Sequence, residues 1–413
     1  MPRLLTPLAL ALIAIAACGP ERPAPRPLAL KAEASPSAAG AAEPNLFTAP
    51  DGRVLMSWIE PAGRNENAMR LAIRNADGTW ATPTTVVQRS DLFVNWADFP
   101  SVVALSDGRL LAHWLQRSGS ARYAYDVQLA ESRDGGATWA TAVRPHKGGI
   151  PAEHGFVSIL PDADGGASVF FLDGSAGATG AAAPAGHDHG PAPMHLSVNS
   201  WRAGIADSTK HILDTKVCDC CQTSAAMTSR GPIVVYRDRS DTEVRDIAIM
   251  RQVEGAWTTT RTVHDDNWVI NACPVNGPAV AAVGENVAVA WFTNARDTAK
   301  VLLAFSNNAG STFGAPIRID LGLPGGRVGL QWVDGAVLAS WLERGESDSA
   351  FVMLRRVMPN GTVEGPLLVS NTSGARSSGF PRMTRLGDGV LLAWTIPGTP
   401  SAVQIATLLP TVP

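Results

Sequence analysis

Pairs of short apolar segments recur along the chain, each pair joined by a turn rich in Asp and Gly and closed by an aromatic residue. Two of them read EPNLFTAPDGRVLMSW and FPSVVALSDGRLLAHW. Apolar runs of this length, bounded by turn residues, predict antiparallel hairpins. Seven segments follow the pattern, and their closing aromatic residues are Trp58, Trp114, Phe171, Tyr236, Trp291, Trp341 and Trp394.

The closing aromatic residue returns roughly every 50–65 residues, a period typical of the blades of a β-propeller. We therefore predict an all-β propeller of four-stranded antiparallel blades over residues 44–413, with seven blades and six as the alternative. The last repeat, from Phe380 to Leu409, has room for only three strands. The alternating stretch Leu28–Glu33 is expected to supply the fourth and close the ring, which removes exposed sheet edges.

Two further segments have the pattern of the Asp box, S-x-D-x-G-x-T-W. Residues 132–139 match it at every defined position, and residues 306–313 carry Asn in place of Asp and Phe in place of Trp. The pattern indicates a tight turn between strands three and four, with Asp or Asn binding backbone amides and Gly at positive φ. With these boxes in register with the repeat, the chain resembles the sialidase-like propellers along nearly all of its mature length. Sialidases have six blades, so the count of seven departs from that family.

The N-terminus has the pattern of an export signal. Arg3 precedes an apolar run, Leu4–Ala17, that is too short to span a bilayer. The run ends at Ile15-Ala16-Ala17-Cys18, which resembles the bacterial lipobox, so residues 1–18 are interpreted as a lipoprotein signal and Cys18 as the lipidated residue. A plain secretory signal is the alternative. By resemblance to lipoprotein sorting, Gly19 favours the outer membrane, and residues 19–43 form a Pro/Ala-rich tether that includes the closing strand.

Composition and charge narrow the classes of partner that this protein is expected to bind. The formal net charge is −3 and no basic cluster stands out, which argues against a nucleic-acid partner. The expected partners are the bilayer, through Cys18, and a metal ion or a small anionic or glycan ligand. A closed propeller has no unpaired edge that requires association, so we expect a monomer.

Strand order predicts which unusual residues share a face. In an up-and-down blade, the 1–2 and 3–4 turns lie on one face, while the segments that lead into each blade and the 2–3 loops lie on the other. The second face receives the 2–3 loop of blade four, Tyr236–Asp246. It also receives a set of residues from the lead-in segments: Asn95, Trp96, Asp98, His154, Cys218, Cys220, Cys221, Asn271, Cys273, Asn276 and Arg327. We expect the functional site on this face.

Four cysteines remain once Cys18 is assigned to lipid. In an oxidising compartment they could form disulfides, for example Cys220 or Cys221 with Cys273. A large propeller does not need such cross-links, and three cysteines within four residues make a poor disulfide pattern. The other interpretation is a copper or zinc site formed by Cys218, Cys220, Cys221, Cys273 and His154. Zinc prefers four tetrahedral ligands, whereas Cu(I) accepts two or three sulfurs.

The family resemblance also implies an alternative function, an exo-sialidase. Sialidases bind the substrate carboxylate with three arginines and use a tyrosine nucleophile with a glutamate partner and an aspartate acid/base. Here the corresponding candidates are Tyr236, Glu243 and Asp98. The candidate ligand-binding residues on the same face are Arg237, Asp238, Arg239, Arg245, Asn271, Asn276 and Arg327. The family's arginine-isoleucine-proline motif is absent, so catalysis is left open beside metal or anion binding and a protein-interaction scaffold.

Overall fold

The computed structural model describes residues 26–177, 193–202, 205–206 and 210–411. Residues 1–18, predicted to be a lipoprotein signal that ends at Cys18, lie outside the described residues. Within these ranges the chain is almost entirely β-strand and loop; helix is limited there to three 3-10 turns, η1 (Ser175–Gly177), η2 (Ala295–Asp297) and η3 (Arg376–Ser378). No helix in the described ranges has the length and apolar character needed to cross a bilayer.

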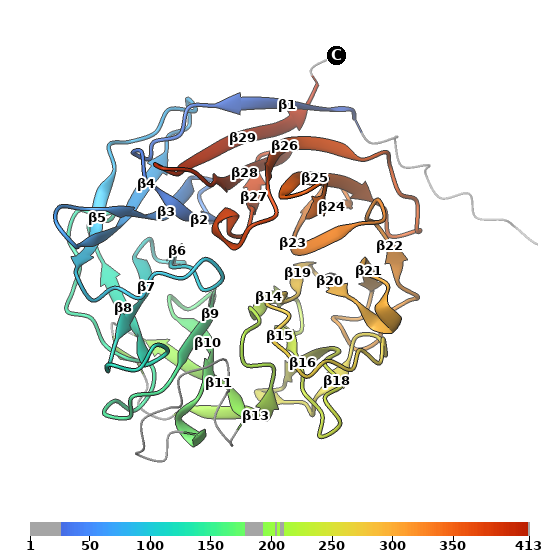
Figure 1. The fold of residues 1–413 in the computed structure, drawn as a ribbon, viewed down its shortest axis with the longest axis horizontal. Helices are drawn as coiled ribbons and strands as arrows, with labels where there is room; N and C mark the ends of the chain where they lie inside the picture. The colour runs from blue at the N-terminus through green and yellow to red at the C-terminus, as the bar shows by residue number, and fades with distance from the viewer. Residues whose placement is uncertain (1–25, 178–192, 203–204, 207–209, 412–413) are drawn as a thin grey trace, which may run out of the picture.

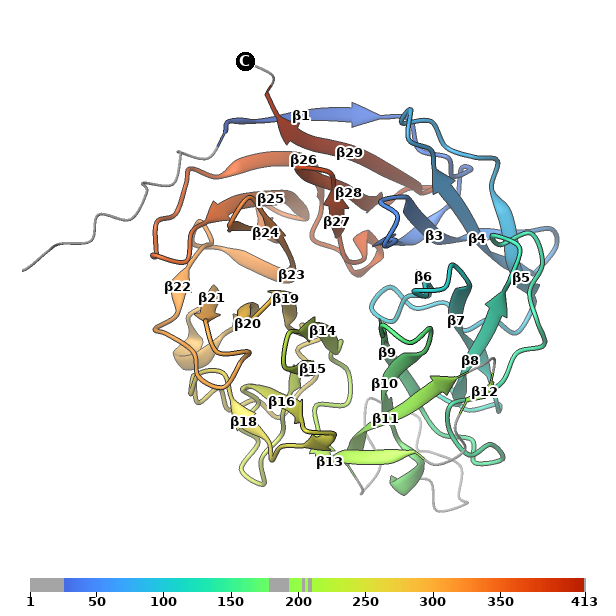
Figure 2. The same ribbon diagram turned by 180° about the vertical axis from the view of Figure 1, so that it is seen from behind.

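Seven antiparallel sheets surround a central axis, as the two opposite views in Figures 1 and 2 show. Blades one and two contain β2 (Ala42–Thr48), β3 (Val54–Pro61), β4 (Asn67–Arg74), β5 (Thr84–Arg89), β6 (Ser101–Ala104), β7 (Leu110–Arg117) and β8 (Tyr125–Ser132). Blade three contains β9 (His154–Pro161), β10 (Ala167–Asp173), β11 (Met194–Arg202), β12 (Ile205–Ala206) and β13 (His211–Val217). Blade four contains β14 (Ser224–Thr228), β15 (Gly231–Arg237), β16 (Ile247–Val253), β17 (Ala256–Trp257) and β18 (Arg261–Thr262).

The remaining blades have the regular four strands. Blade five contains β19 (Ala279–Val283), β20 (Asn286–Thr293), β21 (Lys300–Ser306) and β22 (Ile317–Arg318). Blade six contains β23 (Pro324–Val333), β24 (Ala336–Arg344), β25 (Ser349–Val357) and β26 (Leu367–Ser373). Blade seven contains β27 (Arg382–Leu386), β28 (Gly389–Ile396), β29 (Ala402–Pro410) and β1 (Leu28–Glu33). The prediction of seven blades is confirmed, although in blade two the fourth strand is reduced to a single bridge, Leu129 to Val143.

The ring closes where the sequence predicts. Strand β1 pairs antiparallel with β29, from Leu28 opposite Pro410 to Glu33 opposite Ile405, and lies at the outer edge of blade seven in both ribbon views. The N-terminal strand thus completes the last blade with a segment almost 400 residues away in sequence, about as far apart as this chain allows. Pairing with β1 covers the edge of β29 that would otherwise be exposed.

The core is divided among the blade interfaces. In the described part of the chain seven clusters of buried apolar side chains occur, each drawing mainly on two adjacent blades. The second strands of the blades carry the closing aromatic residues at these interfaces, and all seven are buried: Trp58, Trp114, Phe171, Tyr236, Trp291, Trp341 and Trp394. A single hairpin has no partner for such a side chain, so burial comes from stacking the blades, at about 25 cal/mol per Å² of apolar surface.

Both Asp boxes form the predicted turn. In the first, Asp134 Oδ1 accepts hydrogen bonds from the Thr138 amide at 2.9 Å and the Ser132 hydroxyl at 2.8 Å. Asn308 Oδ1 accepts the equivalent bonds in the second, from Thr312 N at 2.9 Å and Ser306 Oγ at 2.8 Å. Gly136 has φ of +91°, and a Cβ there would lie 2.7 Å from Leu71 of the neighbouring blade, so both conformation and packing require glycine.

Candidate metal-binding site

The lead-in segments of several blades meet on one face of the ring, as strand order predicts. Gln222, which leads into blade four, donates from Nε2 to the carbonyl of Ala97 in blade two at 2.6 Å. Its Oε1 accepts from the amide of Gly277, which leads into blade five, at 3.0 Å. Farther round, Asn276 Oδ1 accepts from the Arg327 amide of blade six at 2.8 Å. These contacts place the lead-in segments of blades two, four, five and six against one another.

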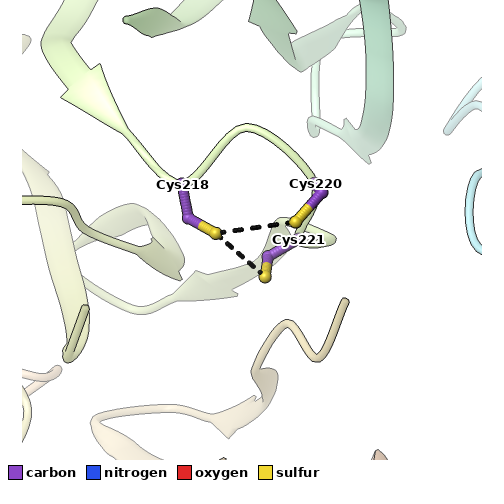
Figure 3. A group of neighbouring side chains, drawn as sticks. All are labelled: Cys218, Cys220 and Cys221. Carbon is purple, nitrogen blue, oxygen red and sulfur yellow. Dashed lines mark hydrogen bonds between the residues drawn. The ribbon is translucent and has the colours of Figure 1, made fainter. Parts of the chain in front are cut away.

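Three of the predicted cysteines form a compact group on this face. They lie in the turn between β13 and β14, and Figure 3 shows their sulfur atoms pointing toward one another. The Cys218 sulfur is 3.2 Å from that of Cys221 and 3.9 Å from that of Cys220. All three sulfurs lie within 4.8 Å of one another. The turn is fixed at its start because the Cys218 amide donates to the carbonyl of Arg237 at 3.0 Å.

Cys273 joins the group from the lead-in segment of blade five. Its side chain interacts with the thiol of Cys220. The four sulfur-bearing residues are thiols in the structure, with Cys218, Cys220 and Cys221 buried and Cys273 partly exposed. We call Cys218, Cys220, Cys221 and Cys273 the thiol site. It joins blades four and five, and Cys273 is the most exposed of its four residues.

One cation contacts the thiol site. Arg245 is buried and its guanidinium Nη1 lies 3.4 Å from the Cys218 sulfur. Burial alone would raise the pKa of Cys218, but hydrogen bonds from Cys220 and Cys221 and the charges of Arg245 and Arg237 lower it well below its usual value. Burial raises the pKa values of Cys220 and Cys221. The arrangement therefore favours one thiolate, at Cys218, beside two protonated thiols.

Arg245 is itself held by acidic partners in the 236–246 loop. Glu243 accepts from Arg245 Nη2 at 2.8 Å and from Arg239 Nη2 at 2.8 Å. Arg239 also binds Asp219, which lies inside the cysteine turn, at 2.9 Å. These contacts clamp the loop against the turn, so Arg239, Glu243 and Arg245 are already paired. Asp238 begins the loop, and burial raises its pKa to about 6.

His154 is not part of the thiol site, which corrects the prediction that it ligates beside the cysteines. It belongs to a separate buried group with Asp126 and His146, between blades two and three. Its Nδ1 lies 3.2 Å from the carbonyl of Tyr125 and its Nε2 lies 2.9 Å from the Ser175 hydroxyl. We call Asp126, His146, His154, Asp173 and Lys210 the histidine cluster. His154 leads into blade three as expected, but its side chain turns toward blade two rather than blade four.

Tyr236 does not pair with Glu243, which corrects the catalytic pair inferred from the sequence. The Tyr236 hydroxyl donates to Asp214 Oδ2 at 2.6 Å and contacts Thr260 Oγ1 at 2.9 Å, while Glu243 is occupied by arginines. Burial and the Asp214 carboxylate raise the pKa of Tyr236. Tyr236 points into the interface with blade three, because alternate residues of β15 face opposite neighbouring blades.

The arginines proposed as an anion clamp are mostly used within the fold. Arg237 is buried, donates to the carbonyls of Asn276, Arg245 and Phe292, and stacks 4.8 Å above the Trp268 ring. Arg327 donates to Ser378 and Gly379 and lies 5.0 Å from the Trp96 ring. The two guanidiniums therefore link neighbouring segments and do not form a common carboxylate site. Asn271, by contrast, is exposed on the segment before Cys273.

A second polar group on this face involves the predicted Asp98 with a tyrosine that the sequence analysis left unused. The Tyr125 hydroxyl donates to Glu153 Oε1 at 2.9 Å and lies 3.3 Å from Asp98 Oδ2. Burial raises the pKa of Asp98 to about 7, partly offset by the bonds from the Phe156 amide and Tyr125. Tyr125 is the first residue of a third strand and Glu153 directly precedes β9, so the same topological rule could have identified both.

Comparison with known proteins finds similar folds among solved structures of low sequence identity. No protein-family model and no curated protein sequence matches the chain. A polysaccharide lyase of family PL25, an ulvan lyase, has a TM-score of 0.56 at 10% identity, over 91% of this chain and 95% of that one. A protein of unknown function from Dyadobacter fermentans has a TM-score of 0.51 at 12% identity, over 90% and 95%.

The NanB sialidase of Streptococcus pneumoniae is less similar, with a TM-score of 0.45 at 14% identity over 92% of this chain and 70% of that one. At these identities the comparisons show the fold alone. The ring of blades and the two Asp-box turns confirm the propeller fold predicted from the sequence.

Proposed function

We propose that this propeller binds a thiophilic metal ion, Cu(I) or Zn(II), at the thiol site. The observation that carries the proposal is the meeting of four thiols from two blades, three of them with sulfurs within 4.8 Å of one another. Thiols are weak hydrogen-bond donors and acceptors, so their mutual contacts do little to explain why four gather at one point. Thiolate sulfur is the ligand that Cu(I) and Zn(II) favour.

The surroundings suit a charged metal–thiolate complex. Thiolate ligands carry more negative charge than the ion neutralises, and Arg245 at 3.4 Å from Cys218 supplies a compensating positive charge. The site is mostly buried, which limits oxidation and competition from water. Binding releases protons from those thiols that are protonated in the free protein.

The test is elemental analysis with a free-thiol count on protein purified under reducing, metal-replete conditions. We expect about one ion per chain, and its loss in Cys218→Ser/Cys220→Ser, because these two sulfurs contact Cys221 and Cys273 and link the site together. Val269→Thr, an exposed change four residues before Cys273, is the matched control and should keep the metal. The proposal would be ruled out if the purified protein contained two disulfides and took up no metal after reduction and reloading.

The proposal includes lipidation at Cys18, because the Ile15–Cys18 segment resembles a lipobox, and a location at the bacterial outer membrane, which Gly19 favours. Acyl chains on Cys18 would hold the propeller at the bilayer, at about 0.8 kcal/mol per buried methylene. We expect the protein expressed with its own signal to partition into detergent and Cys18→Ser to stay in the aqueous phase. Equal aqueous partitioning of both proteins would contradict lipidation.

A second candidate function is glycan cleavage, favoured by the Tyr125–Glu153–Asp98 arrangement. Tyr125, which is hydrogen-bonded to Glu153, could serve as the nucleophile. Asp98, whose pKa is about 7, could serve as the general acid. Tyr125 is fully buried, so substrate would require movement of the surrounding segments. We expect any hydrolysis of a fluorogenic sialoside to be abolished in Tyr125→Phe and retained in Tyr236→Phe. Absence of hydrolysis in the wild-type protein would reject this candidate for sialosides.

A further inference from the structure

We infer that Cys273 is the exchange ligand of the thiol site, the residue through which Cu(I) passes between an external donor or acceptor and the three buried thiols. This inference rests on the proposed function and deepens it by naming the ion and separating the four cysteines into two roles. Cys218, Cys220 and Cys221 form the resting site. Cys273 takes part when the ion arrives or leaves.

Exposure separates the two roles. Cys218 and Cys221 are each 1% exposed and Cys220 is 8% exposed, whereas Cys273 is partly exposed. Cys273 also lies on a different segment, between β18 and β19, while the other three occupy one turn. Because Cys273 contacts Cys220, and Cys220 contacts Cys218, the sulfurs form a continuous path from the surface to the buried end beside Arg245.

The fold holds this path together. The segment that carries Cys273 is fixed to the cysteine turn by Gln222, the residue after Cys221, which accepts from the Gly277 amide at 3.0 Å. A Cβ at Gly277 would lie 2.1 Å from the Gln222 carbonyl oxygen, so only glycine allows this close approach. The Asn276 side chain also joins this segment to blade six, through the Arg327 amide. These contacts fix the segment that carries Cys273 against the cysteine turn and blade six.

The chemistry selects Cu(I) over Zn(II). Cu(I) is stable with two or three thiolates, so three buried sulfurs can hold it while a fourth exchanges. Structural zinc requires four ligands, and Cys273 would then be a permanent ligand. In each exchange step one Cu–S bond forms and another breaks, and copper remains Cu(I). The arriving thiol releases its proton to solvent and the departing thiolate takes one up.

The experiment measures both occupancy and transfer. Wild-type protein, Cys273→Ser and the exposed control Val269→Thr are loaded anaerobically with Cu(I) and mixed with bathocuproine disulfonate, whose Cu(I) complex absorbs visible light. We expect all three to hold about one Cu(I). Transfer to the chelator should be about tenfold slower from Cys273→Ser, and unchanged from Val269→Thr. Cys273→Met, which keeps a soft sulfur donor, should restore part of the rate and serves if the serine variant fails to fold.

The outcomes distinguish a failure of the proposed metal binding from a failure of the exchange role of Cys273. If the wild-type protein holds no Cu(I), the proposed function fails for copper and the inference fails with it. If the wild-type protein holds Cu(I) and Cys273→Ser, folded by circular dichroism, does not, Cys273 is a resting ligand and only the inference is overturned. Equal transfer rates from wild type and both Cys273 variants overturn it as well.

Discussion

The thiol site and the histidine cluster lie in neighbouring parts of the same ring and are both rich in metal-ligating side chains, yet their contacts differ. In the histidine cluster both carboxylates are paired with cations: Asp173 with Lys210, and Asp126 with Arg144 at 3.0 Å. The rings of His146 and His154 stack at 3.8 Å and are nearly parallel. In the thiol site, four weakly hydrogen-bonding groups lie together, and one of them, Cys218, contacts a guanidinium.

The difference separates a structural role from a ligand-binding one. Buried charges need partners, and the histidine cluster supplies strong ones, so its composition is explained by the folded state itself. Nearly parallel stacked rings also cannot both direct a lone pair, within the ring plane, at one ion between them. Weak thiol contacts provide little such stabilisation, so the thiol site is better explained by what it binds. Four predictions sharpen this contrast, from the largest expected effect to the smallest.

Removing the central histidine should destabilise the protein strongly. His154→Ala removes a fully buried ring together with its bonds to Tyr125 and Ser175, a loss of about 2–5 kcal/mol in the free energy of unfolding. Urea unfolding followed by tryptophan fluorescence measures it. Folded His154→Ala should still bind the full amount of Cu(I). Loss of the ion from that folded variant would show that the histidine cluster contributes to metal binding, which contradicts its separation from the thiol site.

Adding Cu(I) should stabilise the wild-type protein by mass action. At a free concentration one thousand times the dissociation constant, a ligand that binds only the folded state contributes about 4 kcal/mol. The melting temperature of the reduced protein should therefore rise with buffered Cu(I), while that of Cys218→Ser/Cys220→Ser should stay constant. An equal rise in both proteins would mean that Cu(I) acts elsewhere on the chain.

Lowering the pH should destabilise the folded protein through Asp173 of the histidine cluster. Burial raises the pKa of Asp173, but hydrogen bonds from His154, Lys210 and Ser175 outweigh burial and lower it far below its usual value. A lowered pKa gives stability that is complete above the unfolded value of about 3.9 and is lost as the pH falls toward the folded value. The slope is about 1.4 kcal/mol per pH unit below pH 4. Unfolding curves of Asp173→Asn, compared with those of the wild type between pH 2 and pH 6, should lack this share of the slope.

Removing one buried thiol should have the smallest effect on the metal-free protein. In Cys218→Ser the hydroxyl can accept from Arg245, so we expect a change within about 1 kcal/mol. Chemical unfolding under reducing conditions without metal gives the value. A loss as large as that in His154→Ala would show that the cysteines serve the fold, and would remove the main reason for proposing that they bind an ion.

Much of this molecule could be predicted from local sequence patterns. The hairpin repeat, the two Asp boxes and the Leu28–Glu33 strand specify the blades and the closure of the ring, because each depends on residues within one hairpin or on an unpaired edge. Strand order also predicted that Cys218, Cys220, Cys221 and Cys273 share a face. The chain direction within a blade is enough to decide on which face a loop lies.

Side-chain partners were decided only by the tertiary structure. His154 turns toward Asp126, and Tyr236 turns toward Asp214. Tyr125, and not Tyr236, lies beside Asp98. Adjacent positions in a strand point to opposite neighbouring blades, so an error of one residue in register, or a bulge such as that between Phe170 and Leu172, changes the partner completely. Register and twist follow from the packing of several blades at once, and no single hairpin sequence contains that information.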